Sequence, residues 1–292
     1  MEVVEITQCL NKDKSEYPSE YIFDVYKGCD VGCIYCDGHS SCYRNHDFEH
    51  VKIKKDILNI LAQELKGKRK KSIIAIGMLS DPYIDIEKDQ QLTRECLKII
   101  KHYGFGVIIH TKSDLILRDL DILKEIHEKN CVIVNVCITS NDELSKKIEH
   151  NVCSSKSRFE IIRKCKEAGL LAGVNMNPVL PYLTDSKEDL LEIIENAKCV
   201  HADYIFSDMK VTLRDKQRDF YYQKLDQLFP GISYYYRRIY NNRYHCEIKS
   251  WKENYELLKK NCIQYELLYQ IDDLIQLVQK HKKEYCQMSL FE

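Results

Sequence analysis

The chain has 292 residues, and 44 lysines and arginines against 45 acidic residues give it a formal net charge of −1. This length suits one large domain or a domain with an appendage, and the balanced charge excludes a polyanion-binding surface that covers the whole molecule. No stretch approaches the roughly 18 apolar residues of a membrane span, and the N-terminus lacks the apolar core of a signal peptide. We therefore expect a cytoplasmic protein without a membrane partner.

The chain contains fourteen cysteines, which is a high count for its length. Thiols stay reduced in the cytoplasm, so metal binding by some of them is a better interpretation than a disulfide framework. Five of them lie in segments of strand or helix periodicity, where a free cysteine behaves as a small apolar residue. These are Cys96, Cys131, Cys137, Cys165 and Cys199.

Short apolar runs alternate with stretches of helical period along most of the chain, which is the pattern of βα units that build a parallel sheet. We expect strands at 21–27, 72–77, 107–111, 131–138, 171–176 and 203–206. Helices are expected between them at 52–65, 88–103, 117–129, 155–168 and 187–197. The pattern predicts an α/β fold, a partial TIM-like barrel of about six units, (β/α)6.

The pattern changes near residue 210. We expect a helix at 212–229, an irregular aromatic stretch at 233–250, and helices at 251–261 and 265–283. The predicted organisation is a barrel over 1–212, a helical and aromatic C-terminal extension over 213–286, and a loose tail over 287–292.

Three cysteines follow the first predicted strand in the sequence Cys29-Asp-Val-Gly-Cys33-Ile-Tyr-Cys36. Barrel-like βα folds place their active sites at this end of the strands. Three thiolates leave one iron of a [4Fe–4S] cluster without a protein ligand, so a small molecule could bind there. The alternatives are a zinc site with His39 or Cys42 as the fourth ligand, and redox chemistry of a CxxC pair.

The CxxxCxxC motif after a first strand resembles the radical S-adenosylmethionine (SAM) superfamily. Further short motifs are similar to those of its spore photoproduct lyase-like branch, also called DNA repair photolyase-like. They are Gly77-Met-Leu-Ser-Asp-Pro-Tyr83, Leu92-Thr-Arg94, Thr111-Lys-Ser113 and Leu117-Arg-Asp119. The resemblance implies a cluster on Cys29, Cys33 and Cys36 that cleaves SAM to a 5′-deoxyadenosyl radical, with an electron donor such as flavodoxin or ferredoxin.

The same resemblance suggests roles at the strand ends. Lys112 ends the third predicted strand and could present its ammonium to the carboxylate of SAM, as a flexible point charge does well. The amine and ribose of SAM would meet residues after the second and fourth strands, namely Ser80, Asp81, Thr139 and Ser140.

The catalytic residues match the lyase only in part. Tyr35 matches a tyrosine of the lyase, whereas Asp37 stands where the lyase has a second tyrosine. Ser80 stands, by spacing, where the lyase has its hydrogen-donating cysteine. We expect catalytic roles for Tyr35 and Ser80, and these departures put repair of the spore thymine lesion itself in doubt.

Two segments suggest partners. Aromatic residues alternate with arginines between Tyr234 and Tyr244, a combination that stacks on bases and neutralises phosphates, although such stretches often pack against a core. The C-terminal pentapeptide resembles the peptide that docks on the bacterial sliding clamp, and the alternative is that it folds back on its own domain. Its residues are Gln287, Met288, Ser289, Leu290 and Phe291.

The sequence thus predicts a radical SAM enzyme that acts on a nucleic acid lesion or base. The alternatives are radical modification of RNA, a peptide or a metabolite, and a non-catalytic iron–sulfur accessory factor docked on the sliding clamp.

Overall fold

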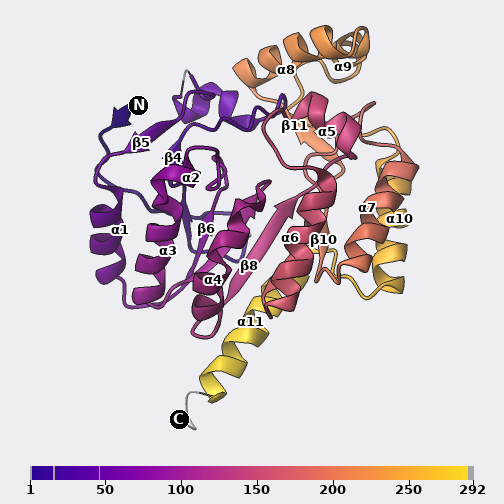
Figure 1. Cartoon of the computed structure of the whole chain (residues 1–292). Helices are drawn as coiled ribbons and strands as arrows, with labels where there is room; N and C mark the ends of the chain where they lie inside the picture. The colour runs from indigo at the N-terminus through magenta and orange to yellow at the C-terminus, as the bar shows by residue number, and fades with distance from the viewer. Residues whose placement is uncertain (1, 16, 46, 289–292) are drawn as a thin grey trace.

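The computed structural model describes residues 2–15, 17–45 and 47–288, with side chains as far as residue 281. A seven-stranded sheet lies at its centre, and its parallel strands follow one another in chain order (Figure 1). From one edge to the other the strands are β10 (Ile205–Phe206), β9 (Leu171–Asn175), β8 (Val132–Cys137), β7 (Gly106–Thr111), β6 (Ile73–Ile76), β3 (Tyr21–Phe23) and the antiparallel β2 (Asn11–Lys12). Because β10 and β2 do not pair within the described residues, the sheet is an open, partial barrel, which confirms the predicted fold class.

Parallel strands require crossover connections, and helices supply them here. They are α1 (Ile57–Lys66), α3 (Leu92–His102), α4 (Leu120–His127), α6 (Ser155–Glu167) and α7 (Lys187–Cys199), with the shorter α2 (Glu87–Gln90) and α5 (Asp142–Ile148) at the ends of the strands. Every residue of β7 and β8 is buried, as expected of strands with both faces covered.

The side chains on one face of the central strands β7 and β8 change from apolar to polar along the strands. Side chains on one face recur at every second residue, so Ile108 and His110 share a face of β7, and Ile133 and Asn135 share the matching face of β8. The register pairs Ile108 with Ile133 and His110 with Asn135. This face is therefore apolar at the start of the strands and polar toward their C-terminal ends.

Several expectations about the elements were wrong, including the helix expected at 265–283, which begins only at Ile271. The predicted first strand is split into β3 and β4 (Tyr26–Lys27), and β4 pairs in a small second sheet with β5 (Lys52–Lys54), beside β1 (Val3–Val4). The split falls at Asp24, whose carboxylate accepts hydrogen bonds from the backbone N–H groups of Leu79 and Ser80. The helix expected from residue 52 begins only at Ile57, because 52–54 form β5, and helix α5 was not predicted.

Strand β11 (Lys210–Thr212) ends the range predicted for the barrel. The predicted C-terminal extension then forms α8 (Asp215–Leu228), α9 (Ile232–Tyr240), β12 (His245–Glu247), α10 (Trp251–Gln264) and α11 (Ile271–Met288), which runs two residues beyond it. The first part of the expected irregular stretch at 233–250 is the helix α9. Tyr236 and Tyr240, one turn apart on it, bury their rings 5.3 Å from each other. Strand β11 pairs with β12 at the predicted boundary of residue 212.

Helix α11 lies across the end of the sheet that is remote from α8 and α9 (Figure 1). Its Leu274 and Val278 are buried against the apolar end of the strands, in one cluster with Ile108 and Ile133. The predicted clamp peptide falls outside the described residues at Ser289, Leu290 and Phe291, and the backbone of Gln287 and Met288 continues α11. Within the described ranges, no helix is long and apolar enough to cross a membrane.

Candidate active site

The loop that carries Cys29, Cys33 and Cys36 is held by backbone hydrogen bonds to segments distant in sequence. Cys29 N–H donates to Phe48 O over 2.8 Å, and Ile34 N–H donates to Ile148 O over 3.0 Å. The loop turns through Gly28 at φ +90° and Gly32 at φ +72°, backbone conformations that favour glycine. Backbone contacts and two glycine turns thus hold the loop in this shape.

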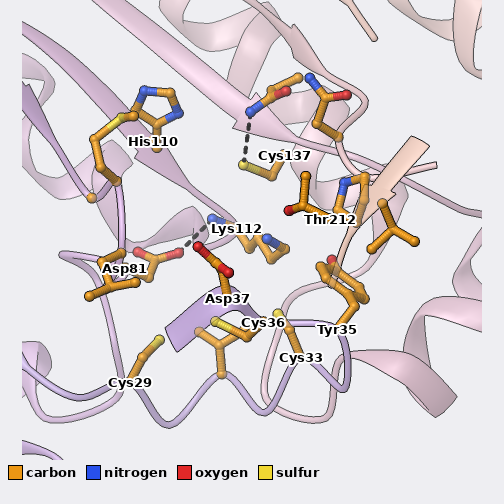
Figure 2. Close-up of a pocket in the computed structure, with 18 of the residues that line it drawn as sticks. Cys29, Cys33, Tyr35, Cys36, Asp37, Asp81, His110, Lys112, Cys137 and Thr212 are labelled. Atoms are coloured by element: carbon orange, nitrogen blue, oxygen red, sulfur yellow. Dashed lines mark hydrogen bonds between the residues drawn. The ribbon is translucent and has the colours of Figure 1, made fainter. Parts of the chain in front are cut away.

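All three thiols line one pocket at the C-terminal ends of the strands (Figure 2). Its cavity is about 280 Å³, and it collects side chains from the cysteine loop, from four strand ends and from the extension. Besides the three cysteines they include Tyr35, Asp37, Asp81, His110, Lys112, Cys137, Asn175, Lys210, Thr212 and Gln217. The predicted extension therefore forms part of the pocket wall.

Burial keeps the thiols protonated while no metal is bound. It raises the pKa of Cys29 to about 12 and that of Cys36 to about 11. The thiolate is the form that binds metal, so metal binding must displace these protons.

Lys112 extends from the end of β7 into the pocket, and its side chain is 14% exposed. Its Nζ lies 3.9 Å from a carboxylate oxygen of Glu149 and 6.0 Å from the centre of the Tyr35 ring. Burial opposes the charge of Lys112, but the nearby buried carboxylate of Glu149 favours it, and the pKa of Lys112 is raised above its ordinary value. The pocket thus holds a cation close to the cysteine loop.

Glu149 is a residue of this site that the sequence did not predict. Its side chain is fully buried and accepts a hydrogen bond from the Tyr35 phenol. Burial opposes its charge too, but Arg158 and Lys112 outweigh this effect and lower the pKa of Glu149. No motif in the segment after α5 signals such a role.

Asp81 lies in the pocket with its carboxylate already bound. It accepts hydrogen bonds from Lys112 N–H over 2.7 Å, from the Thr111 hydroxyl over 2.8 Å and from Tyr83 N–H over 2.9 Å. Asp81 therefore joins the ends of β6 and β7, as the dashed line in Figure 2 shows in part.

Three other predicted residues are buried near the strand ends but are not among the side chains that line this pocket: Ser80, Thr139 and Ser140. Within the described part of the chain, the hydroxyls of Thr139 and Ser140 have no hydrogen-bond partner. Their roles stay predictions.

His110 lines the pocket, and its ring contacts the buried side chain of Asn135. The Asn135 amide oxygen accepts from the Tyr204 hydroxyl, and its nitrogen faces His110 Nδ1 at 3.0 Å. In this assignment Nδ1 is the acceptor, so the proton of the neutral ring is on Nε2. Among the described residues this buried Nε2 has no partner, and His110 lines the pocket.

The residues proposed as a fourth zinc ligand have other partners. The His39 ring stacks on Phe220 with centroids 3.7 Å apart, and Cys42 accepts a hydrogen bond from the Ser40 hydroxyl over 3.2 Å. No three His, Cys, Asp or Glu side chains in the described ranges are placed to hold a single metal ion.

The sequence profile described as the radical SAM superfamily matches residues 23–195, which include the cysteine loop and most of the sheet. The chain belongs to the radical SAM superfamily. Its cofactors are accordingly a [4Fe–4S] cluster and SAM.

The radical SAM chain has relatives in bacteria and archaea. Proteins of Mycobacterium tuberculosis and Mycobacterium bovis, both described as uncharacterized, are 27% identical over 242 residues, which are 79% of this chain and 71% of each relative. A protein of Methanocaldococcus jannaschii is 31% identical over 173 residues, which are 57% of this chain and 63% of the relative.

Solved structures of spore photoproduct lyase share the fold of this radical SAM chain. One is 16% identical with a TM-score of 0.69 and covers 91% of this chain and 81% of its own. Another, complexed with the dinucleoside spore photoproduct, is 17% identical with the same TM-score and the same coverage.

The pocket of this radical SAM protein fits its two cofactors. Three buried or half-buried thiols and Lys112 line the same cavity, and so does His110, whose buried Nε2 has no partner among the described residues. Thiolates could hold iron there, and the ammonium could hold a carboxylate.

Proposed function

We propose that this radical SAM enzyme holds its cluster through Cys29, Cys33 and Cys36 and acts on a base or lesion in nucleic acid. The presence of all three thiols and Lys112 in a single pocket is the observation that carries the proposal. When bound, the reduced cluster supplies the electron that splits SAM into methionine and a 5′-deoxyadenosyl radical.

The protein's own residues bind and orient in this scheme. Lys112 binds the carboxylate of SAM, because its ammonium lies in the same pocket as the three thiols and 6.0 Å from the ring of Tyr35 in the cysteine loop. The Tyr35 phenol is fixed by its hydrogen bond to Glu149, which keeps the ring at the pocket wall. Gln217 of α8 donates to Tyr35 O over 2.9 Å, so the extension also secures this wall.

The surface of α9 supports nucleic acid as the substrate class. Its inner tyrosines are buried, whereas Tyr234 and Tyr235 are 59% and 50% exposed. Arg238 is exposed on the same helix, and the Tyr182 ring lies 5.5 Å from that of Tyr235. Exposed rings beside an arginine suit stacked bases and phosphates. The spore photoproduct lyase structure with a dinucleoside bound points to the same substrate class.

A base in duplex DNA would have to leave the stack to reach this pocket, which costs a few kcal/mol and favours damaged sites. Asp37 and Ser80 differ from the residues expected of spore photoproduct lyase at these positions. The proposal therefore names damaged or modified bases as the substrate class and does not name a particular photoproduct. An electron donor such as flavodoxin or ferredoxin completes the reaction.

Binding of a fluorescent single-stranded oligonucleotide tests this surface. We expect Tyr235→Ala to weaken binding by roughly tenfold, because one base stack contributes about 1–3 kcal/mol. Arg238→Ala should reduce the salt dependence of binding, and Arg163→Ala on α6 serves as the control. Equal binding by all four proteins would contradict the assignment of α9.

The reaction itself separates the alternatives. Ultraviolet-damaged DNA should increase 5′-deoxyadenosine formation over undamaged DNA, whereas an RNA-, peptide- or metabolite-modifying enzyme would show no such preference. A cluster that forms without any SAM cleavage would instead favour the accessory factor.

A further inference from the structure

The segment between α5 and α6 is bound along the cysteine loop. Glu149 forms an isolated antiparallel bridge with Cys33, and Asn151 N–H donates to Val31 O over 3.0 Å. The Ile148 carbonyl accepts from Ile34 N–H, as described above. The backbone of Glu149 is therefore part of the support of the predicted cluster ligands.

The side chain of Glu149 joins this support to the cation in the pocket. Its carboxylate accepts from the Tyr35 phenol and from the Ser145 hydroxyl over 3.1 Å, and it lies 3.9 Å from Lys112 Nζ. The distance of 3.9 Å is a loose ion pair, so Lys112 keeps donors free for a second anion.

Arg158 keeps Glu149 charged and in place. Its guanidinium lies 2.7 Å from the Glu149 carboxylate, and neither side chain is exposed. Arg158 also donates to Cys137 O over 3.0 Å and to Cys153 O over 3.1 Å, which ties it to the end of β8 and the start of α6. Glu149 therefore has a permanent partner when Lys112 turns to another ligand.

Two cations share one carboxylate in this group. Lys112 and Arg158 are buried or nearly buried, and among the described side chains Glu149 is the carboxylate paired with both. The Asp81 carboxylate also attracts Lys112, but three other hydrogen bonds already hold it. Buried charges require partners, so the group accommodates one further anion on the Lys112 side. The carboxylate of SAM is an anion of this kind.

We propose that Glu149 is a positioning residue that holds the Lys112 ammonium beside the cysteine loop, ready for the SAM carboxylate. This inference rests on the proposed role of Lys112. Glu149 does not touch SAM; it acts through Lys112 and Tyr35.

Equilibrium binding to the anaerobically reconstituted protein tests the inference, with two ligands that differ in one group. SAM carries the carboxylate, and decarboxylated SAM has the same sulfonium and adenosine without it. We expect Glu149→Gln to weaken SAM binding about tenfold and to change the binding of decarboxylated SAM less than twofold, because only the carboxylate meets Lys112. Lys112→Met should also weaken the binding of SAM much more than that of decarboxylated SAM, and its loss of SAM affinity should be larger than that of Glu149→Gln.

Two further variants keep the test decisive. Glu143→Gln removes an exposed carboxylate on α5 that pairs with Lys147, and it should bind both ligands like the wild type. Glu149→Asp keeps the charge opposite Arg158 but withdraws it from Lys112, so it should fold and still bind SAM several-fold more weakly. Iron content and thermal unfolding are measured for each variant.

Equal weakening of both ligands by Glu149→Gln would mean that the residue only supports the loop, and it would overturn the inference. Wild-type SAM binding by Glu149→Asp would do the same. If Lys112→Met prefers SAM over decarboxylated SAM as strongly as the wild type does, Lys112 does not bind the carboxylate. The inference about Glu149 is then also wrong. Cleavage of SAM to 5′-deoxyadenosine is scored separately, so failure of the proposed function is distinguished from failure at Glu149.

Discussion

The guanidinium of Arg158 lies 2.7 Å from the carboxylate of Glu149, and both side chains are completely buried. Arg158 also donates to the Ser145 hydroxyl over 2.8 Å, so one side chain links α5, α6 and the end of β8. A buried pair of this kind is costly to break, because the remaining charge has no solvent around it.

Replacing Arg158 with Met should therefore destabilise the protein strongly. We expect a loss of about 3–5 kcal/mol in the free energy of unfolding, because Glu149 is left buried without its main partner. Urea unfolding of the metal-free protein measures this change. The control is Arg163→Met, which breaks exposed pairs on α6 and should cost at most about 1 kcal/mol. Equal effects of the two substitutions would contradict this interpretation of the buried pair.

Each cysteine of the loop should be needed for the cluster. Cys29→Ala, Cys33→Ala and Cys36→Ala are expected to lose most of the iron and sulfide that the wild type binds on anaerobic reconstitution, because each removes one of the three thiolates assigned to the cluster. Cys42→Ala serves as the matched control, since this exposed thiol lies just beyond the loop. Full iron content in a Cys36→Ala protein, or its loss in Cys42→Ala, would show that the ligands are assigned wrongly.

His110 should make stability depend on pH. Burial, with a smaller contribution from Lys112, lowers the pKa of His110 from 6.5 to about 4. The folded state therefore binds fewer protons than the unfolded state between these values, and the stability present above pH 6.5 is lost as the pH falls toward about 4. The shift corresponds to roughly 3 kcal/mol.

Urea unfolding at several pH values checks this expectation in the metal-free protein. His110→Gln removes the titrating group, so its free energy of unfolding should fall less steeply between pH 6.5 and 4 than that of the wild type. Parallel pH profiles would rule out His110 as the cause.

Helix α11 should stabilise the barrel by closing the apolar end of the strands. Leu274→Ala removes a fully buried side chain from the cluster with Ile108 and Ile133, and we expect a cost of about 2–5 kcal/mol. The exposed Ile263→Ala on α10 is the control and should stay within about 0.5 kcal/mol of the wild type. A negligible effect of Leu274→Ala would mean that α11 is not needed for the fold.

Much of the barrel was predictable because its strands are continuous apolar runs separated by helical periods. The expected strands at 107–111 and 171–176 differ from β7 and β9 by one residue at one end. The pattern failed where a tertiary contact interrupts a strand, as at Asp24, or where an aromatic run forms a helix, as in α9. Single-sequence periodicity does not carry either kind of information.

That the cysteine loop and Lys112 lie near each other was predictable, because a position within one loop or at one strand end is visible in the sequence. Glu149, His110 and Asn135 were not, because their roles arise from partners far along the chain: Glu149 meets Tyr35 from 114 residues away. Cys137 was expected to be an ordinary core residue, and it is buried, but its position at the end of β8 brings it into the pocket.

Detection of 5′-deoxyadenosine tests the central claim most directly. The wild-type protein is reconstituted anaerobically with iron and sulfide, reduced with dithionite and incubated with SAM, beside Cys33→Ala and Cys42→Ala. We predict that the wild type and Cys42→Ala form 5′-deoxyadenosine and methionine, whereas Cys33→Ala forms neither. An intact cluster in the wild type without SAM cleavage, or cleavage that persists in Cys33→Ala, would contradict the assignment of this pocket as a radical SAM active site.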